Sequence, residues 1–168
     1  SANDGTNGAE LWKSDGTAAG TVLVKDIRSG SAAPSGLTNI NGTIYFSAND
    51  GTNGNELWKS DGTATGTVMV KDIYPGAANS SPSGFTNVNG TIYFRAYDGT
   101  NGIELWKSDG TVAGTVLVKD IYPGSSSSNS SGFTNVNGTL YFVADDGTNG
   151  AELWKSDGTD AGTVLIKD

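Results

Sequence analysis

The sequence predicts an all-β fold, a β-propeller-like array of four-stranded antiparallel blades. Three observations lead to this prediction. First, the segment Glu-Leu-Trp-Lys-Ser-Asp-Gly-Thr recurs at spacings of 46, 48 and 48 residues, starting at Glu10, Glu56, Glu104 and Glu152. Second, each period holds four short stretches rich in β-branched and aromatic residues, bounded by Gly, Asp and Asn. Third, no stretch shows the helical period of about 3.6 residues, and four strands in such a repeat are typical of a propeller blade.

The copy that starts at residue 85 illustrates the first two strands. Residues 85–88 and 91–97 are rich in β-branched and aromatic side chains and flank the dipeptide Asn89-Gly90. Asn-Gly suits the two positive-φ positions of a type I′ hairpin turn. We therefore expect the two segments to pair as antiparallel strands, named A and B.

Two further strands complete the unit. Strand C is expected at residues 103–108 and strand D at residues 115–121, each after a turn rich in Gly, Asp and Asn. Side chains alternate between the two faces of a strand, which predicts that Val118 and Ile121 lie on opposite faces. Both faces carry bulky residues, so we expect sheets that are covered on both sides.

The repeat boundaries predict how the chain is divided. We expect residues 1–168 to form a single repeat array. Residues 1–36 should form a partial blade of strands C and D with a linker, and complete blades should follow at residues 37–84, 85–132 and 133–168. An open β-solenoid-like stack of the same hairpins, without circular closure, is the alternative.

The number of blades predicts self-association. Known propellers have at least about four blades, so three complete blades do not close a ring. An unclosed stack exposes aromatic faces and unpaired sheet edges, which favour aggregation. We therefore expect a homo-oligomer or a head-to-tail polymer, although the termini could also be cuts in a longer array.

The composition excludes several classes of function. The 168 residues include no His and no Cys, which excludes a Ser-His-Asp triad, a thiol nucleophile, a disulfide and the usual zinc sites. A net charge of −8 disfavours a nucleic-acid surface, and no apolar run approaches the roughly 20 residues of a membrane span. Residues unique to one copy do not supply an acid, a base and an oxyanion donor. We expect no nucleic-acid partner, no membrane insertion, no catalytic residues and no required cofactor.

The turns between strands B and C carry an acid and an amide three residues apart. The candidate metal ligands are Asp50, Asn53, Asp98, Asn101, Asp146 and Asn149. Oxygen donors at this spacing could bind Ca²⁺, which prefers hard ligands. In the alternative interpretation, the Asp carboxylate accepts backbone hydrogen bonds and the Asn and Gly residues adopt turn conformations. The spacing does not match an EF-hand loop.

One tryptophan lies at the centre of each strand C. We expect these side chains to pack between blades, and the alternative is that they stack against sugar rings. The four are Trp12, Trp58, Trp106 and Trp154. The Glu two residues before each Trp lies on the same strand face, where a buried carboxylate must find a hydrogen-bond partner such as a backbone amide or a Lys.

The copies differ mainly at one end of each blade, where the B–C turns and the D–A connections emerge. The candidate binding face consists of Asn49, Asn55, Tyr97, Ile103 and Asp145. Loops on a rigid scaffold commonly carry binding functions, so a glycan or a surface protein is a candidate partner. Neutral drift in solvated loops would produce the same pattern.

The repeat resembles the ELWxxDGT repeat family of bacterial, largely secreted or surface proteins. The resemblance rests on residues 104–111, Glu-Leu-Trp-Lys-Ser-Asp-Gly-Thr, and 114–121, Gly-Thr-Val-Leu-Val-Lys-Asp-Ile, and it spans all four copies. It implies propeller-like blades at an extracellular or cell-surface location, often beside adhesion-type modules, without established catalytic residues or an agreed ligand.

The expected function is therefore a non-catalytic extracellular module for recognition or adhesion. The alternative is a structural repeat of a surface adhesin, an extracellular filament, or a symmetric engineered propeller with no ligand. The near identity of the copies also resembles a recently amplified or deliberately symmetrised propeller.

Overall fold

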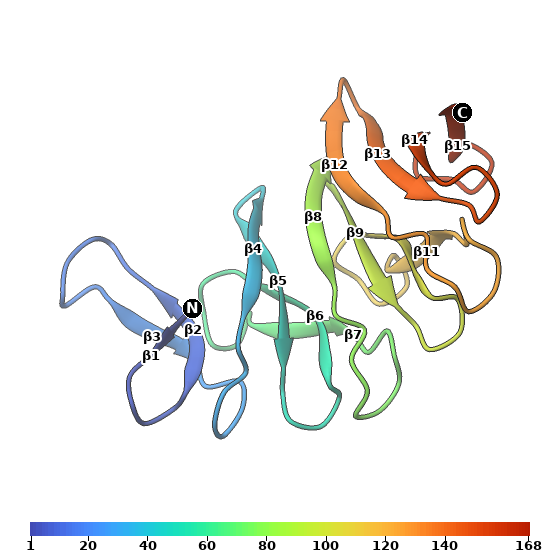
Figure 1. Ribbon diagram of the computed structural model, residues 1–168. Coiled ribbons are helices and arrows are strands. Elements are labelled where there is room, and N and C mark those ends of the chain that lie inside the picture. Colours follow the sequence, from blue (N-terminus) through green and yellow to red (C-terminus); the bar gives the residue numbers. More distant parts are fainter. The chain divides into compact units, whose positions relative to one another are not determined.

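The computed structural model describes all residues, 1–168, and confirms the all-β, propeller-like fold (Figure 1). Fifteen strands form four antiparallel sheets. No helix of the structure has the length and apolar character needed to cross a membrane. The chain divides into two compact units, Ser1–Ser81 and Pro82–Asp168, and each unit contains two of the sheets.

The first unit holds a three-stranded and a four-stranded sheet. The first sheet consists of β1 (Ala2–Asn3), β2 (Ala9–Lys13) and β3 (Val22–Lys25). The second sheet consists of β4 (Ser35–Ile40), β5 (Thr43–Asn49), β6 (Asn55–Ser60) and β7 (Val68–Lys71).

The second unit holds two four-stranded sheets. The third sheet consists of β8 (Ser83–Val88), β9 (Thr91–Tyr97), β10 (Ile103–Ser108) and β11 (Val116–Lys119). The fourth sheet consists of β12 (Ser131–Val136), β13 (Thr139–Asp145), β14 (Ala151–Ser156) and β15 (Val164–Lys167). Strands β8 and β12, the A strands of the two sheets, lie side by side (Figure 1).

Each four-stranded sheet is a meander in which the order of strands along the chain is also their order in the sheet, A-B-C-D. The first strands begin at Ser35, Ser83 and Ser131, two residues before the blade boundaries expected at 37, 85 and 133. Between strands A and B, Asn89 and Gly90 have φ angles of 53° and 87°, as a type I′ turn requires. The predicted hairpin is therefore confirmed.

The sheets within each unit stack face to face. We call the face that carries the Leu of Glu-Leu-Trp the Leu face of a sheet, and the opposite face, which carries the Trp, its Trp face. In the first unit, Leu11 and Val24 on the Leu face of the first sheet pack with Phe46 and Trp58 on the Trp face of the second. Burial of these apolar side chains supplies the main driving force for the stacking.

The second unit repeats this arrangement. Leu105 and Val118 on the Leu face of the third sheet pack with Phe142 and Trp154 on the Trp face of the fourth. Ile121 belongs to the same core as Val118, so the expectation that these two residues lie on opposite faces is wrong. The reason is that β11 ends at Lys119, and the alternation of a strand does not continue into the bend that follows.

Candidate functional site

The B–C turns are closed by hydrogen bonds within the turn itself. In the second sheet, Oδ1 of Asp50 accepts the backbone N–H groups of Thr52 and Asn53, both at 2.8 Å. Oδ2 accepts the side-chain amide of Asn53 at 2.7 Å. The turns that begin at Asp98 and Asp146 have the same bonds.

These bonds agree with the second interpretation of the B–C turns, in which the Asp carboxylate accepts hydrogen bonds from its own turn. In each turn, the amide nitrogen of the Asn points at the Asp, and both carboxylate oxygens already have donors. Hydrogen bonds from the backbone N–H groups of Asn149 and Thr148 lower the pKa of Asp146 below its ordinary value. The structure contains no group of three or more acidic side chains that could hold a metal ion.

In the first three sheets, the D–A connection that follows strand D passes directly over the B–C turn. A Cβ atom on Gly102 would lie 1.9 Å from the carbonyl oxygen of Ser126, and one on Gly54 would lie 1.8 Å from that of Ala78. Both glycines also have positive φ, 72° and 73°. Only glycine allows this close approach, so the turn and the connection form one continuous surface at this end of the blade.

A buried Glu fastens the connection at two points. Oε2 and Oε1 of Glu104 accept the backbone N–H groups of Ile121 and Ser128, at 3.1 and 2.8 Å. Glu56 accepts the N–H groups of Ile73 and Ser80, at 2.7 and 3.0 Å, and the hydroxyl of Ser80 at 2.6 Å.

The first sheet contains the same device, because Glu10 accepts the N–H groups of Ile27 and Ala32, both at 2.8 Å. Each of the three carboxylates is fully buried. Burial raises the pKa of Glu56 and of Glu104 to about 7, although the hydrogen bonds from Ser80 and Ser128 oppose this shift. The three carboxyl groups therefore set the position of the loops.

The structure brings the candidate binding residues together in pairs. Asn49 lies directly opposite Asn55 at the base of the second sheet's B–C turn, and Tyr97 lies opposite Ile103 in the third sheet. Asp145 lies opposite Ala151 in the fourth sheet. Each blade therefore presents one cross-strand pair, and the chemistry of the pair changes from amide to apolar to acidic.

A residue of the preceding D–A connection covers this turn. In the first unit, Nη1 of Arg28 donates to Oδ1 of Asn49 at 3.3 Å, and a Cβ atom on Gly51 would lie 3.1 Å from Nε of Arg28. In the second unit, Tyr122 takes the equivalent place, since a Cβ atom on Gly147 would lie 2.6 Å from its ring. The expected binding face does not include either residue. The sequence does indicate this position, because the copies differ there: the first has Arg28 and the others have Tyr.

Three of the four tryptophan side chains are buried, and two of them, Trp58 and Trp154, lie in the cores between stacked sheets. Trp58, Trp106 and Trp154 are each 6% exposed, and Nε1 of Trp154 donates to the carbonyl oxygen of Ala144 at 3.1 Å. Trp12 in the first sheet is only half-buried. The three buried rings offer no free face on which a sugar could stack.

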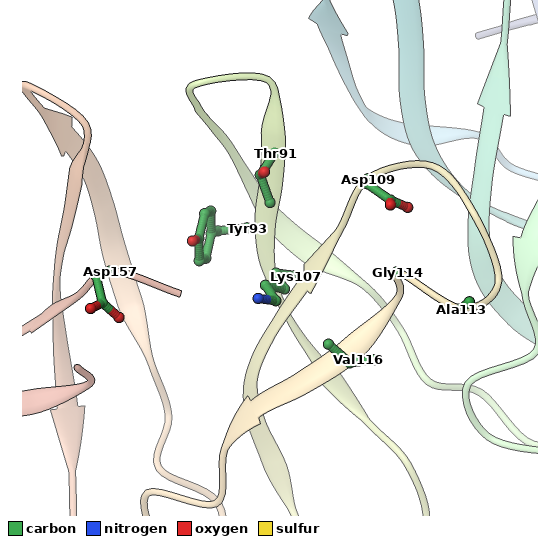
Figure 2. A pocket seen from close by; sticks show the side chains of 8 residues that line it. All are labelled: Thr91, Tyr93, Lys107, Asp109, Ala113, Gly114, Val116 and Asp157. Atoms are coloured by element: carbon green, nitrogen blue, oxygen red, sulfur yellow. The ribbon is translucent and has the colours of Figure 1, made fainter. Parts of the chain in front are cut away.

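A hollow of about 460 Å³ lies at the other end of the blades, where the A–B and C–D loops emerge (Figure 2). Tyr93 and Lys107 point toward the loop that carries Asp157, and Nζ of Lys107 donates to the carbonyl oxygen of Gly158 at 2.8 Å. A second hollow of about 310 Å³ occupies the equivalent place on the fourth sheet. Both are lined largely by residues that the third and fourth sheets share, such as Lys107 and Lys155, so differences between copies do not indicate them.

No protein-family model and no curated protein matches this chain. Among solved structures, the chain is similar to the computationally designed Ika8 protein, with 16% identity and a TM-score of 0.50 over 97% of this chain and 43% of that one. It is also similar to an alpha-L-arabinofuranosidase (CtGH43) from Clostridium thermocellum, with 18% identity and a TM-score of 0.39 over 85% of this chain and 55% of that one. The chain thus spans about half the length of each, and at these identities the similarity concerns the fold alone.

Proposed function

We propose that this chain is a non-catalytic repeat module of an extracellular or cell-surface protein that binds a glycan or a protein through one end of its blades. The binding surface consists of the B–C turns and D–A connections. One observation carries the proposal: the B–C turns of the three four-stranded sheets share one geometry, and each presents a cross-strand pair whose chemistry differs from sheet to sheet. The extracellular location rests on the resemblance of the repeat to the ELWxxDGT family.

In the second and third sheets, hydrogen bonds and close packing hold the loops around the variable pair in place. The D–A connection is held at both ends by a buried carboxylate such as Glu104, and it packs on a turn whose glycine, Gly102, admits no side chain. A surface that is ordered before binding loses little conformational entropy in the complex. The variable pairs of the second and third sheets are therefore presented in a defined geometry.

The exposed groups suit a ligand with several unlike features. Asn49, Asn55 and Arg28 supply amide and guanidinium donors and amide acceptors in the first unit, which match sugar hydroxyls or a peptide backbone. In the second unit, Ile103 is 36% exposed beside Tyr97 and adds an apolar contact. Aromatic side chains with a polar tip are favoured at binding interfaces.

The polar groups at the loop end support a non-catalytic role. The carboxylates of Glu56 and Glu104 are occupied by backbone N–H groups, and those of Asp50, Asp98 and Asp146 close their own turns. A general acid or base must reach a proton of the substrate, and none of these carboxylates is presented for that purpose.

A symmetrised variant tests the proposal against neutral drift. Tyr97→Asn, Ile103→Asn, Asp145→Asn and Ala151→Asn together give the third and fourth sheets the Asn pair of the second. These positions are at least partly exposed, so the variant should keep its fold. On a glycan array and in pull-downs with surface proteins, we expect the parent chain to bind and the variant to lose at least about tenfold in affinity. Equal binding by both chains would contradict the proposal.

The second candidate function is a structural repeat of an adhesin or filament, or a symmetric engineered propeller without a ligand. One observation favours it: the charged side chains that recur in the repeat form hydrogen bonds with the protein's own backbone. The Lys residues donate to backbone carbonyl oxygens, and the Glu and Asp residues accept from backbone N–H groups. No binding on the array together with long polymers in electron micrographs would favour this candidate, whereas a closed soluble particle that binds a ligand would favour recognition.

A further inference from the structure

The Leu face of the fourth sheet is an apolar surface with no sheet packed on it. Leu153 and Ile166 are 45% and 43% exposed there. Their counterparts in the first sheet, Leu11 and Val24, are 4% and 8% exposed because the Trp face of the second sheet covers them. The side chains at these two repeat positions are therefore buried when the next sheet of the unit packs on the Leu face.

The lysines of this face differ in the bonds that they make across the interface. In the first unit, Lys13 donates to the carbonyl oxygen of Gly62 at 3.0 Å and Lys25 donates to that of Thr67 at 2.7 Å. These bonds join the first sheet to the C–D loop of the second. In the fourth sheet no further sheet faces the equivalent residues, Lys155 and Lys167, and Lys167 is exposed where Lys25 is half-buried.

The first sheet exposes the complementary surface. On its Trp face, Trp12 is half-buried, whereas Trp58 and Trp154 are 6% exposed. The hydroxyl residues Ser14 and Thr21 are exposed there, although the corresponding residues of the second and fourth sheets are buried: Ser60, Thr67, Ser156 and Thr163. The Trp face of the first sheet is therefore the uncovered half of the same type of interface.

We infer that the Leu face of the fourth sheet docks on the Trp face of the first sheet in a second copy of this chain. This interface goes beyond the proposed recognition function. It has the register in which the sheets of each unit already stack. Lys13 and Lys107 each donate to a Gly of the C–D loop that faces them, and in the same register Lys155 donates to the carbonyl oxygen of Gly16. The contact is heterologous, because it joins two different faces and leaves each copy with one of each free.

The occupant is a second copy because the chain forms this contact within each of its own units. Ala2, Trp12 and Leu23 of the first sheet correspond to Ala144, Trp154 and Leu165, which line the Trp face of the fourth sheet. The first sheet has no strand A and only two residues of strand B. It therefore covers Leu153 and Ile166 and leaves the region over β12 open.

Two matched variants test this register. Leu153→Glu and Val136→Glu each place a carboxylate on the same face, at positions that are 45% and 46% exposed, but Val136 lies on β12, outside the proposed contact. In sedimentation velocity over a series of concentrations, we expect the parent chain and the Val136→Glu variant to associate alike. The Leu153→Glu variant should associate at least about tenfold more weakly. Circular dichroism verifies that both variants are folded.

A mixing experiment tests that the contact is heterologous. Leu23→Glu blocks the Trp face of the first sheet and leaves the fourth sheet intact; if it does not fold, Trp12→Ser takes its place. Leu23→Glu and Leu153→Glu should each be monomeric alone. An equimolar mixture of the two should form a 1:1 dimer, because the intact Leu face of the fourth sheet in Leu23→Glu can dock on the intact Trp face of the first sheet in Leu153→Glu. A parent chain that remains a 17.2 kDa monomer at every concentration would overturn the inference. So would a Val136→Glu variant as defective as Leu153→Glu, or a mixture that stays monomeric.

Discussion

Oε1 of Glu104 accepts a hydrogen bond of 2.8 Å from the backbone N–H of Ser128, a residue 24 positions later in the chain. The other oxygen of this carboxylate bonds to Ile121 at 3.1 Å. A single side chain of strand C therefore holds both the beginning and the end of a D–A connection. Burying a carboxylate is costly in free energy unless it is hydrogen-bonded, and here the bonds also decide the path of a loop.

Replacing Glu104 should therefore destabilise the protein. In the Glu104→Ala variant, two buried N–H groups lose their acceptor, at about 1–3 kcal/mol each. We expect the free energy of unfolding in urea to fall by about 2–5 kcal/mol. Glu152 is the matched control, because it holds the same repeat position and is only half-buried, and its replacement by Ala should cost about 1 kcal/mol or less. Equal losses at the two positions would contradict this role of the buried Glu.

Stability should decrease as the pH rises from about 5 to 8. The pKa of Glu56 and Glu104 is raised from 4.5 to about 7 by burial. Between these two values the folded protein binds more protons than the unfolded chain, so the free energy of unfolding falls with pH until the folded-state pKa is passed. Each carboxyl should contribute about 3 kcal/mol to this fall.

Urea unfolding at several pH values measures this slope. The Glu56→Gln/Glu104→Gln variant lacks both titrating groups and should show a much flatter profile over the same range, at a lower overall stability. A parent protein whose stability is constant or increases between pH 5 and 8 would show that these carboxyl groups are already ionised in the folded state at pH 5.

Gly102 should tolerate no side chain, whereas Gly150 should tolerate one at moderate cost. Both have positive φ, 72° and 77°, but a Cβ atom on Gly102 would lie 1.9 Å from the carbonyl oxygen of Ser126, and one on Gly150 would meet nothing within 4 Å. Gly150→Ala should therefore cost about 1 kcal/mol from backbone strain alone. Gly102→Ala should cost at least about 3 kcal/mol, because the connection must also move. Thermal and urea unfolding of the pair separate the two terms, and equal costs would refute the close approach.

Calcium should leave the stability unchanged. The carboxylates of Asp50, Asp98 and Asp146 are occupied by donors of their own turns. A ligand that binds only the folded state raises the melting temperature, so the addition of CaCl₂ or of a chelator should shift it by less than about 1 °C. A rise of several degrees with Ca²⁺ that a chelator reverses would instead establish the B–C turns as cation sites.

Local chemistry made much of the fold predictable. The Asn89-Gly90 turn and the strands beside it follow from residues adjacent in sequence, because a type I′ turn depends on two φ angles and the strands on alternation and β-propensity. Ile121 shows the limit of this reasoning. Alternation holds only while the strand continues, and β11 ends at Lys119.

The candidate site was less predictable because it depends on contacts between distant segments. A need for a partner could be inferred for Glu104, but its bond to Ser128 depends on the path of the D–A connection. Arg28 and Tyr122 lie over a turn of the following sheet, a relationship that only the stacking of sheets reveals. The hollow beside Tyr93 is likewise produced by two sheets together.

The near identity of the repeats has a consequence for how the chain reaches this structure. Every strand pairs only with its neighbours in sequence, and local pairing of this kind favours rapid folding. A hairpin of one copy fits the strands of another almost as well as its own, so hairpins can also exchange between blades or between molecules. Refolding should therefore slow and become heterogeneous as the protein concentration rises, and a few substitutions that make one copy distinctive would restore a single kinetic phase.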